Sequence, residues 1–528
     1  MIQNTKQIKN ALISISNTTG IIDFAKSLVS KNIKLFATSG TAKLLKKNNI
    51  NVIKIAHYTQ CPEIMNSRIK TLHHKIYASI LAQPEKDKKI IKKNNIILMD
   101  MIIVNFYPFS TNLQNKNLIF KNAMENIDIG GPSMVRAAAK NYKNVLVIVK
   151  PKLYSFIVQE MTKNNNIITN KTKLNFATIA LKYVMHYDEK IYHYFKKKNN
   201  TTSINPFQKT LPTHLTLQLI KKQDLYYGEN KLEQAAWYTT DQNKNYGKLN
   251  IQQLQGKTLS YNNLLDIYSS LSCIQEFKEF TCVILKHGNP CGISTSSNNY
   301  NAYLLAYETD PISAFGGTIA FNTILDEKTT QTILEKQFLE IILAPEFTHE
   351  AKKALNKKPN LRVIQYLKNY NYSYYHIDIK SIYGDFLIQN NIQNTIKTKK
   401  WKIVSKKIPT LKEIHDAKFA LKVVKHLKSN AVVFVKNKTT ITIGSGQTSR
   451  IDAIKIAINK TNNSLSLKNT ILASDAFFPF KDSIELISNK KISCIIQPGG
   501  SIQDKKIIHS VNQHKISMIF TKSRYFKH

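Results

Sequence analysis

Short apolar runs alternate with segments of helical spacing along the N-terminal third of the chain. Residues 21–31 and 42–47 repeat apolar side chains with the period of a helix. The predicted strands are residues 11–16, 34–38, 51–56, 100–106 and 145–149. Apolar strands that alternate with helices predict a doubly wound α/β fold on a parallel sheet. Ligands of such sheets bind beyond the carboxyl ends of the strands.

A polar stretch at 196–205 is the best candidate for a domain boundary. The region after it has an α/β or α+β pattern, and a second polar stretch at 390–400 divides that region into two halves. Each half contains a strand–turn–helix segment, at 283–292 and at 431–450. We therefore expect two domains, 1–200 and 201–528, with the second split near 390–400. The dinucleotide motif G-x-G-x-x-G is absent, which disfavours a dinucleotide ligand.

Charge is the unusual feature of the composition. The 528 residues include 76 Lys and Arg against 34 Asp and Glu, a formal net charge of +42. Only five of the basic residues are Arg, and the Lys are spread along the whole chain without clusters of stacking aromatics. Lys, Asn and Ile are residues of A/T-rich codons, so a genomic base bias explains the charge without a nucleic-acid partner. At the few positions that keep Arg, the need for a planar guanidinium that binds an anion is a reason for its presence.

Other classes of protein are disfavoured by simple counts. No run of 18 apolar residues predicts a membrane span, and no signal peptide is visible. Five scattered Cys without a C-x-x-C pair disfavour a disulfide framework and a structural zinc site. We therefore expect a cytoplasmic protein that binds no membrane.

Three segments of the first domain contain candidate site residues, and the first two are rich in groups that bind phosphate. Ser39, Gly40 and Thr41 stand between a strand and a helix, where hydroxyls and free amides bind an anion or simply cap the helix. The run RIKTLHHK from Arg68 is either a phosphate and base site or a solvated basic face. Tyr107 follows a buried strand, as a site residue or as an aromatic plug.

The segment IDIGGPSMVRAAAK is more specific. Two glycines allow close backbone approach, and Pro132 suits a first helical turn. Arg136 and Lys140 then share one helix face. Asp128 before the helix and Lys140 on it can form an acid–base pair; the alternative is a helix start with exposed basic residues.

In the second region, Lys286 and His287 stand at the end of a predicted strand, before Gly, Asn and Pro. His acts as a base near neutral pH, and Lys stabilises negative charge. Ser294 stands where a zinc deaminase has its second Cys, and no H-x-E precedes the turn, so zinc is disfavoured. The loop DPISAFGG from Asp310 suits a flat heterocycle, and GSGQTSR, which ends at Arg450, suits a phosphate or carboxylate; each is alternatively a structural turn.

Taken together, these segments resemble one family over essentially the whole chain. It is the bifunctional purine-biosynthesis family that combines aminoimidazole carboxamide ribotide transformylase with IMP cyclohydrolase. The matching runs, in order, are RIKTLH, NFYPF, IDIGGPSMVRAAAKN, GKTLSYNNLLD, KHGNPCG, DPISAFGG, NLRV, KSNAVVFVK, GSGQTSR, ASDAFFPF, IIQPGGS and SRYFKH.

The resemblance implies a methylglyoxal-synthase-like cyclohydrolase domain and a transformylase of two cytidine-deaminase-like halves without zinc. It implies a homodimer, and 10-formyltetrahydrofolate as co-substrate. The implied cyclohydrolase residues are catalytic Lys70, Thr71, Tyr107, Asp128 and Lys140, with Ser39, Gly40, Thr41 and Arg68 at the nucleotide pocket. The implied transformylase residues are catalytic Lys286 and His287, with Asp310, Phe315, Asn430, Arg450 and Arg524 binding substrate.

The family's reactions suit these residue types. His287 would accept a proton from the 5-amino group of the ribotide as that nitrogen attacks the formyl carbon, and Lys286 would stabilise the oxyanion. The carboxamide nitrogen then attacks the new formyl group and water leaves. Asp128 and Lys140 would move protons in that step, which is intramolecular and gains from positioning.

Several positions depart from the family's usual pattern: Thr18, Tyr226, Leu232, Asp385, Gln503 and Tyr525. Tyr226 replaces an Arg that contacts nucleotide phosphate, so we expect a raised KM for the ribotide and retained chemistry. Two alternatives stay open: a decayed enzyme with cyclohydrolase activity only, and a basic nucleic-acid-binding protein.

Overall fold

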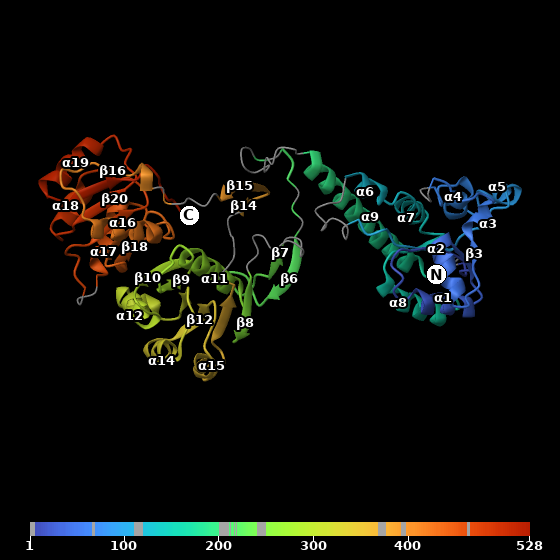
Figure 1. Ribbon diagram of the computed structural model, residues 1–528, viewed down its shortest axis with the longest axis horizontal. Coiled ribbons are helices and arrows are strands. Elements are labelled where there is room, and N and C mark those ends of the chain that lie inside the picture. The colour runs from blue at the N-terminus through green and yellow to red at the C-terminus, as the bar shows by residue number, and fades with distance from the viewer. Residues whose placement is uncertain are drawn as a thin grey trace. The chain divides into compact units, whose positions relative to one another are not determined.

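The computed structural model describes residues 6–65, 69–109, 120–199, 211, 213–215, 217, 219–239, 250–367, 376–391, 396, 398–461 and 465–528. The chain forms two compact units, Met1–Asn205 and Pro206–His528. Each unit has its own sheet and its own buried apolar clusters. Figure 1 shows the first unit in blue to blue-green and the second in green to red.

The first unit is a five-stranded sheet with helices on both faces. Its strand order is β3-β2-β1-β4-β5, and every neighbouring pair is parallel. The strands are β1 (Asn10–Ser14), β2 (Lys34–Ala37), β3 (Ile53–Lys54), β4 (Met101–Val104) and β5 (Leu146–Ile148). The helices are α1 (Ile21–Ser30), α2 (Ser39–Lys47), α3 (Ile55–Thr59), α4 (His74–Leu81), α5 (Lys88–Lys93), α6 (Phe120–Glu125), α7 (Gly130–Lys140), η2 (Pro151–Leu153), α8 (Tyr154–Lys163) and α9 (Asn170–Asn199). This confirms the predicted doubly wound parallel sheet.

Alternation along the strands explains why both faces are covered. In β1, Ala11 and Ile13 join a cluster with residues of α1 and α8, while Leu12 joins a second cluster with residues of α4, α7 and α9. Successive side chains of a strand point to opposite faces. An apolar strand therefore needs a helix layer on each side, and the wholly apolar runs of this unit have one.

The second unit contains a twelve-stranded sheet made of two halves with the same topology. The order is β16-β21-β20-β19-β17-β18-β10-β9-β11-β12-β13-β8. The first half is β8 (Ile251–Gln255), α11 (Tyr261–Ile274), β9 (Thr281–Lys286), β10 (Asn289–Thr295), α12 (Asn299–Thr309), α13 (Pro311–Ala314), β11 (Gly317–Phe321), α14 (Glu327–Lys336), β12 (Leu339–Ala344), α15 (His349–Asn356) and β13 (Arg362–Tyr366). The second half is β16 (Lys402–Ile403), α16 (Leu411–Val424), β17 (Val432–Lys436), β18 (Thr439–Gly444), α17 (Arg450–Asn459), β19 (Ile471–Ser474), α18 (Asp482–Ser488), β20 (Cys494–Gln497), α19 (Asp504–Gln513) and β21 (Ser517–Phe520). The remaining elements are β6 (Ile220–Leu225) paired with β7 (Ala235–Thr239), β14 (His376–Ile382) paired with β15 (Asp385–Asn391), and η3 (Thr398–Lys400).

The two halves repeat each other strand by strand. In each, a hairpin is followed by three strands separated by helices, and the hairpin's first strand pairs antiparallel with the strand after it. The fourth, fifth and sixth strands of each half are parallel, and the first strand pairs antiparallel with the sixth. The hairpin strands β10 and β18 pair antiparallel, Ser294 opposite Thr439, and join the halves into one sheet.

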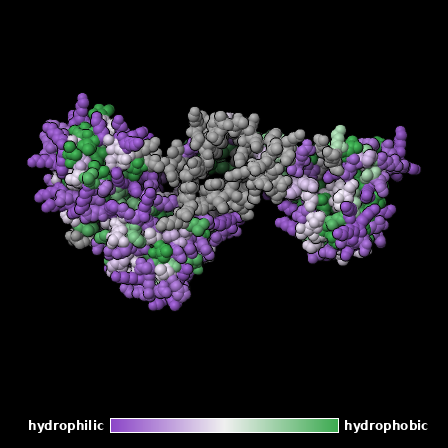
Figure 2. Space-filling model, viewed as in Figure 1, coloured by the Kyte–Doolittle hydropathy of each residue, from purple (hydrophilic) through white to green (hydrophobic). Residues whose placement is uncertain are grey.

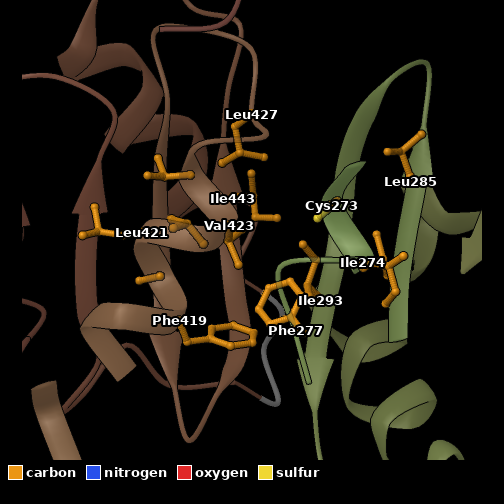
Figure 3. Packing of buried hydrophobic residues seen from close by; sticks show 14 of the residues in the cluster. Cys273, Ile274, Phe277, Leu285, Ile293, Phe419, Leu421, Val423, Leu427 and Ile443 are labelled. Atoms are coloured by element: carbon orange, nitrogen blue, oxygen red, sulfur yellow. The ribbon is translucent and has the colours of Figure 1, made fainter. Parts of the chain in front are cut away.

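One apolar cluster spans the join. Figure 3 shows Phe277, Ile274 and Ile293 of the first half facing Phe419, Val423 and Ile443 of the second. The rings of Phe277 and Phe419 lie 5.2 Å apart between centroids. Burial of this cluster favours a fixed arrangement of the two halves, because separating them would return its apolar surface to water.

On the face shown in Figure 2, hydrophilic residues cover most of each unit, and smaller hydrophobic patches lie among these hydrophilic residues. None of the helices in the described parts of the chain is both long enough and apolar enough to cross a bilayer.

Candidate active sites

The carboxyl end of the first unit's sheet is held together at Asn105, directly after β4. Its side-chain oxygen accepts hydrogen bonds from the amides of Ser16 (2.7 Å) and Asn17 (2.8 Å), which follow β1. Strand order reverses between β1 and β4, because β1 leads to β2 on one side and β4 lies on the other. Such a reversal is where doubly wound sheets bind ligands.

The segment Ser39-Gly40-Thr41 lies at this same end of the sheet, after β2. We predicted that it precedes a helix starting at residue 42; instead α2 begins at Ser39, with Thr38 as N-cap and no side-chain cap. The Ser39 amide donates to Glu63 Oε1 (3.4 Å), and Thr41 Oγ1 accepts from the Ile15 amide (3.3 Å). The first turn of α2 thus already holds a carboxylate, as expected at the positive end of a helix dipole.

The start of α7 brings Asp128 and Thr71 together. The Gly131 amide donates to Asp128 Oδ1 (2.8 Å). A Cβ at Gly130 would lie 2.3 Å from Thr71 Oγ1, and one at Gly131 would lie 2.7 Å from Asp128 Oδ2. Both glycines are therefore needed for the close approach of these side chains to the backbone, as the motif predicted.

The structure does not bring Asp128 and Lys140 together. Asp128 precedes α7, whereas Lys140 is its last residue and is exposed. At about 1.5 Å of rise per residue, the two ends of α7 lie roughly 15 Å apart. A direct acid–base pair between these two side chains of one chain is excluded by that separation, and Arg136 on the same face pairs with Asp188 of α9 (2.7 Å).

Two tyrosines of α9 support this site, and sequence reasoning missed both. The hydroxyl of Tyr187 accepts a hydrogen bond from the Asp128 amide (2.8 Å), and that of Tyr183 accepts from the Phe106 amide (3.5 Å). Burial raises the pKa of both hydroxyls. They hold the backbone on either side of the site, and only their spacing on one helix face was visible in the sequence.

The remaining predicted residues of this site differ in accessibility. Lys70 is half-buried and Thr71 is buried, while Tyr107 is exposed directly after β4. Arg68 lies outside the described residues. His73 stacks on His74, and burial lowers the pKa of His73.

In the second unit, Lys286 and His287 lie at the tip of the β9–β10 hairpin. His287 has φ of 52° and Gly288 has φ of 73°, so both adopt the left-handed conformation that tight hairpin turns require. His287 is exposed. Lys286 Nζ donates to the carbonyl of Phe315 (2.6 Å), which links the hairpin to the predicted loop after Asp310.

Two side chains distant in sequence hold the Gly288 peptide unit. Its amide donates to Asp266 Oδ1 on α11 (2.7 Å), and its carbonyl accepts from Lys527 Nζ near the end of the chain (3.4 Å). Lys527 also donates to the carbonyl of His426 (3.1 Å), and burial lowers the pKa of its ammonium. Sequence reasoning identified neither residue, although both lie in or next to runs that resemble the family.

The second half contributes a wall to the same hairpin. The Asn289 amide group donates to Ser445 Oγ (2.5 Å), and its oxygen accepts from the Lys428 amide (3.1 Å). Arg450 donates to Asn430 Oδ1 (2.8 Å), so these two predicted residues do lie together.

Arg450 is nevertheless largely occupied by protein. Its guanidinium is 6% exposed and bonds Asp475 and Ser474. Buried and paired in this way, it orders the backbone around Asn430. Arg524, by contrast, is exposed and lies over the ring of Phe526, 5.1 Å from its centroid.

A cavity of about 200 Å³ opens beside the hairpin at the join of the halves. Its lining includes Lys286, His287, Asn289, Asp310, Ser445 and Lys460. Lys460 Nζ contacts Asp310 Oδ2 (3.1 Å) across the join. Although burial acts in the opposite direction, hydrogen bonds from Ser313 and the charge of Lys460 lower the pKa of Asp310.

A larger cleft of about 1050 Å³ lies on the other side of Phe315. Its lining includes Tyr226, Tyr227, Lys257, Phe315, Phe338 and Arg362. Tyr226 is 80% exposed, and Leu232 is 99% exposed. Lys257 and Arg362 give this cleft cationic side chains, although position 226 bears an aromatic one. Among the described residues, no group of three His, Cys, Asp or Glu is placed to hold a metal ion.

Comparisons with known proteins match two family models to different parts of the chain. The model of the AICARFT/IMPCHase bienzyme family matches residues 138–460, and the MGS-like domain matches residues 20–133. A bifunctional purine biosynthesis protein PurH of Buchnera aphidicola subsp. Baizongia pistaciae is 64% identical over 527 residues, covering 99% of this chain and all of that protein. The PurH proteins of Buchnera aphidicola subsp. Schizaphis graminum and of Buchnera aphidicola subsp. Acyrthosiphon pisum are 48% and 45% identical to this chain. Each match covers 99% of this chain and 99% of the relative. The crystal structure of ForH matches 36% of this chain and 97% of its own at 26% identity with a TM-score of 0.34, too low to bear on the fold.

Proposed function

The chain belongs to the AICARFT/IMPCHase bienzyme family, and we propose that its two units divide the family's two reactions between them. It is a bifunctional enzyme of purine biosynthesis, a transferase and a hydrolase, that performs the last two steps of IMP synthesis on nucleotide and folate substrates. The first domain, 1–200, would close the ring, and the second, 201–528, would transfer the formyl group.

Formyl transfer is assigned to the β9–β10 hairpin. The observation that supports this most is the exposed His287 beside a cavity at the join of the halves. His287 accepts a proton from the 5-amino group of aminoimidazole carboxamide ribotide as this nitrogen attacks the formyl carbon of 10-formyltetrahydrofolate. Lys286 has three donors, of which the Phe315 carbonyl takes one, so donors remain for the developing oxyanion.

The other predicted residues of this site orient the substrates. Asp310 and Phe315 lie on the loop that the Lys286 ammonium contacts. Arg524 is free to meet an anionic group of the ribotide. Asn430 and Arg450 hold each other and the segment facing the hairpin, so we assign Arg450 to positioning Asn430.

Ring closure is assigned to the carboxyl end of the first unit's sheet. Thr71 and Asp128 lie at the start of α7. We assign Lys70 and Tyr107 to the same site, and Ser39, Gly40, Thr41 and Arg68 to nucleotide binding, from the resemblance of their motifs to those of the family. Asp128 moves a proton from the carboxamide nitrogen, while Thr71 and Tyr107 hydrogen-bond the formyl oxygen. Because Lys140 ends α7, its role does not involve contact with Asp128 of the same chain.

The experiment is a coupled assay from aminoimidazole carboxamide ribotide and 10-formyltetrahydrofolate to IMP, with each step also measured alone. His287→Ala should reduce formyl transfer by about 10²-fold or more and spare ring closure, and Asp128→Asn should do the reverse. Lys140→Ala tests the predicted catalytic residue that lies at the opposite end of α7 from Asp128. Formyl transfer by His287→Ala at the rate of the unmodified enzyme would contradict the assignment, and ring closure alone in the unmodified enzyme would indicate a decayed transferase.

We also propose a cytoplasmic homodimer. The hairpin β14–β15 exposes apolar side chains, among them Ile382, Phe386 and Leu387, which is typical of a surface that another subunit covers. Sedimentation of the purified protein should give twice the chain mass of 60.4 kDa.

A further inference from the structure

We propose that Asp266 is the positioning residue of His287: its carboxylate fixes the turn that presents the imidazole, and its negative charge stabilises the imidazolium formed on proton transfer. The inference rests on the proposed role of His287 and extends it to a residue of α11. Asp266 touches no reacting atom, so it acts on the reaction only through the turn and through its charge.

The geometry of the turn is the first support. Asp266 Oδ1 accepts the Gly288 amide at 2.7 Å, on the residue directly after His287. His287 itself is a non-glycine residue with φ of 52°, a conformation that costs free energy unless its surroundings hold it. A carboxylate bound to the neighbouring amide supplies that restraint from a helix, which is a rigid element.

The second half of the same unit supplies an internal comparison. Asp416 lies on α16 as Asp266 lies on α11, and it precedes Lys436 by as many residues as Asp266 precedes Lys286. Asp416 accepts both amides of its turn, Asn437 and Lys438, each at 2.8 Å. Asn437 has φ of 54°, close to that of His287. The motif of a helix carboxylate beneath a hairpin turn therefore occurs twice.

The two copies differ in how the carboxylate is used. Asp416 is 5% exposed and spends both oxygens on backbone amides. Among the described residues, Asp266 receives one hydrogen bond from its turn, through Oδ1. In the part of the chain that the structure describes, Asp266 Oδ2 accepts no hydrogen bond from the His287 amide, whereas Asp416 Oδ2 accepts one from the Asn437 amide. In the half whose first turn residue is His287, the carboxylate keeps an oxygen and its charge for the imidazole.

The charges around the turn explain why an anion is needed there. Lys286 precedes His287 on β9, the Lys428 backbone contacts Asn289, and Lys527 Nζ contacts the Gly288 carbonyl. These three cations oppose a positive charge on the imidazole. Among the described residues, Asp266 of α11 interacts electrostatically with His287, Lys428 and Glu340. Asp310 lines the same cavity as His287, but its carboxylate pairs with Lys460. Burial raises the pKa of Asp266, while the Gly288 amide and the charges of His287 and Lys428 act in the opposite direction.

The test substitution is Asp266→Asn, which keeps an oxygen for the Gly288 amide and removes the charge. We expect kcat for formyl transfer to fall about tenfold, with less than about a twofold change in the KM of the ribotide. The acid limb of the kcat profile should move to lower pH by roughly half a unit to one unit, because the imidazolium loses a nearby anion. Asp266→Glu, which restores the charge, should return the limb toward its original position.

Asp416→Asn is the matched control, since it makes the same chemical change beneath a turn whose first residue is Asn437 instead of a histidine. It should lower the melting temperature and leave the pH profile in place. Ring closure, measured separately, should be unaffected in both variants. Thermal unfolding of each variant shows whether the second unit is folded; if Asp266→Asn is not, Asp266→Glu still tests the position.

The outcomes separate this inference from the function beneath it. If His287→Ala is inactive but Asp266→Asn has the original kcat and pH profile, Asp266 is structural only. An equal shift of the limb in Asp416→Asn would also overturn the inference, because the effect would then be a general one of stability. If His287→Ala transfers formyl normally, the proposed function itself fails.

Discussion

The two halves of the second unit share a topology, strand for strand, and yet the proposed general base lies on only one of their hairpins. Lys286 donates to the Phe315 carbonyl (2.6 Å), and Lys436 at the matching place donates to the Lys468 carbonyl (3.2 Å). The turn residues have nearly the same φ angles. What differs is the side chain at the first turn position, His287 in one half and Asn437 in the other.

This comparison separates structure from chemistry within one fold. The lysine and the carboxylate beneath the turn occur in both halves, so part of their work is to hold a hairpin. The second half spends its own polar residues on support: Arg450 and Asp475 form a buried pair beside Asn430, and Ser445 bonds Asn289 of the first half. One copy of the fold then presents the reactive group, and the other builds the wall that faces it.

The largest expected effect comes from substituting the first turn residue of each hairpin. His287→Ala should reduce formyl transfer by about 10²-fold to 10⁴-fold, the usual contribution of a general base. Asn437→Gly tolerates the same φ and should leave kcat unchanged. Steady-state rates of the two variants decide the matter, and comparable losses in both would mean that the halves do not differ in function.

The supporting role of the second half is tested at its buried Arg. Arg450→Lys cannot reproduce the planar contacts with Asp475 and Asn430 and should lower the free energy of unfolding by about 3 kcal/mol. Arg524→Lys, at an exposed position, should change stability by less than about 0.5 kcal/mol and act on the ribotide KM instead. Denaturant titration distinguishes the two variants. A stable Arg450→Lys enzyme with a raised KM for the ribotide would place Arg450 at the substrate.

The join between the halves should weaken in acid. Glu276 of the first half contacts Lys425 of the second at 2.5 Å. Burial pushes its pKa up, but hydrogen bonding to His426 and the charge of Lys425 bring it down to about 2. A lowered pKa in the folded state means stability that is present above the unfolded value, near 4.5, and is lost as pH falls toward 2.

Unfolding measured between pH 6 and pH 2.5 should therefore show a loss of about 2 kcal/mol that Glu276→Gln removes, because the variant has no carboxyl to titrate. At neutral pH the variant itself should be less stable than the unmodified protein. A pH dependence identical in both proteins would show that this pair does not hold the join.

The smallest expected effect concerns the cleft of the first half. Tyr226→Arg places a planar cation beside Lys257 and Arg362 and should lower the ribotide KM by up to about tenfold, the worth of one charge-assisted contact. Tyr226→Phe is the control and should leave the KM near its original value. A KM unchanged in Tyr226→Arg would show that the phosphate binds elsewhere.

The amino-acid sequence by itself determined the parallel sheet of the first unit, the two glycines that begin α7, and the turn that bears Lys286 and His287. Each is a local signal: an apolar run, a Gly-Gly-Pro helix start, a strand followed by Gly, Asn and Pro. It also singled out Asn430 and Arg450, which the structure brings together. The boundary at Ser39 was misplaced because Thr38, not Ser39, provides the N-cap.

Only the tertiary structure decided which distant groups meet. The repeat of the two halves lies in strand order and pairing, which diverged side chains conceal, so no short period showed it. Tyr187 and Lys527 act on backbone atoms far along the chain, and such contacts leave no spacing to recognise. The length of α7 separated Asp128 from Lys140, and burial paired Arg450 with Asp475. Local patterns specify elements, whereas partners are chosen by packing, since it is packing that decides which polar groups lose water and must find one another.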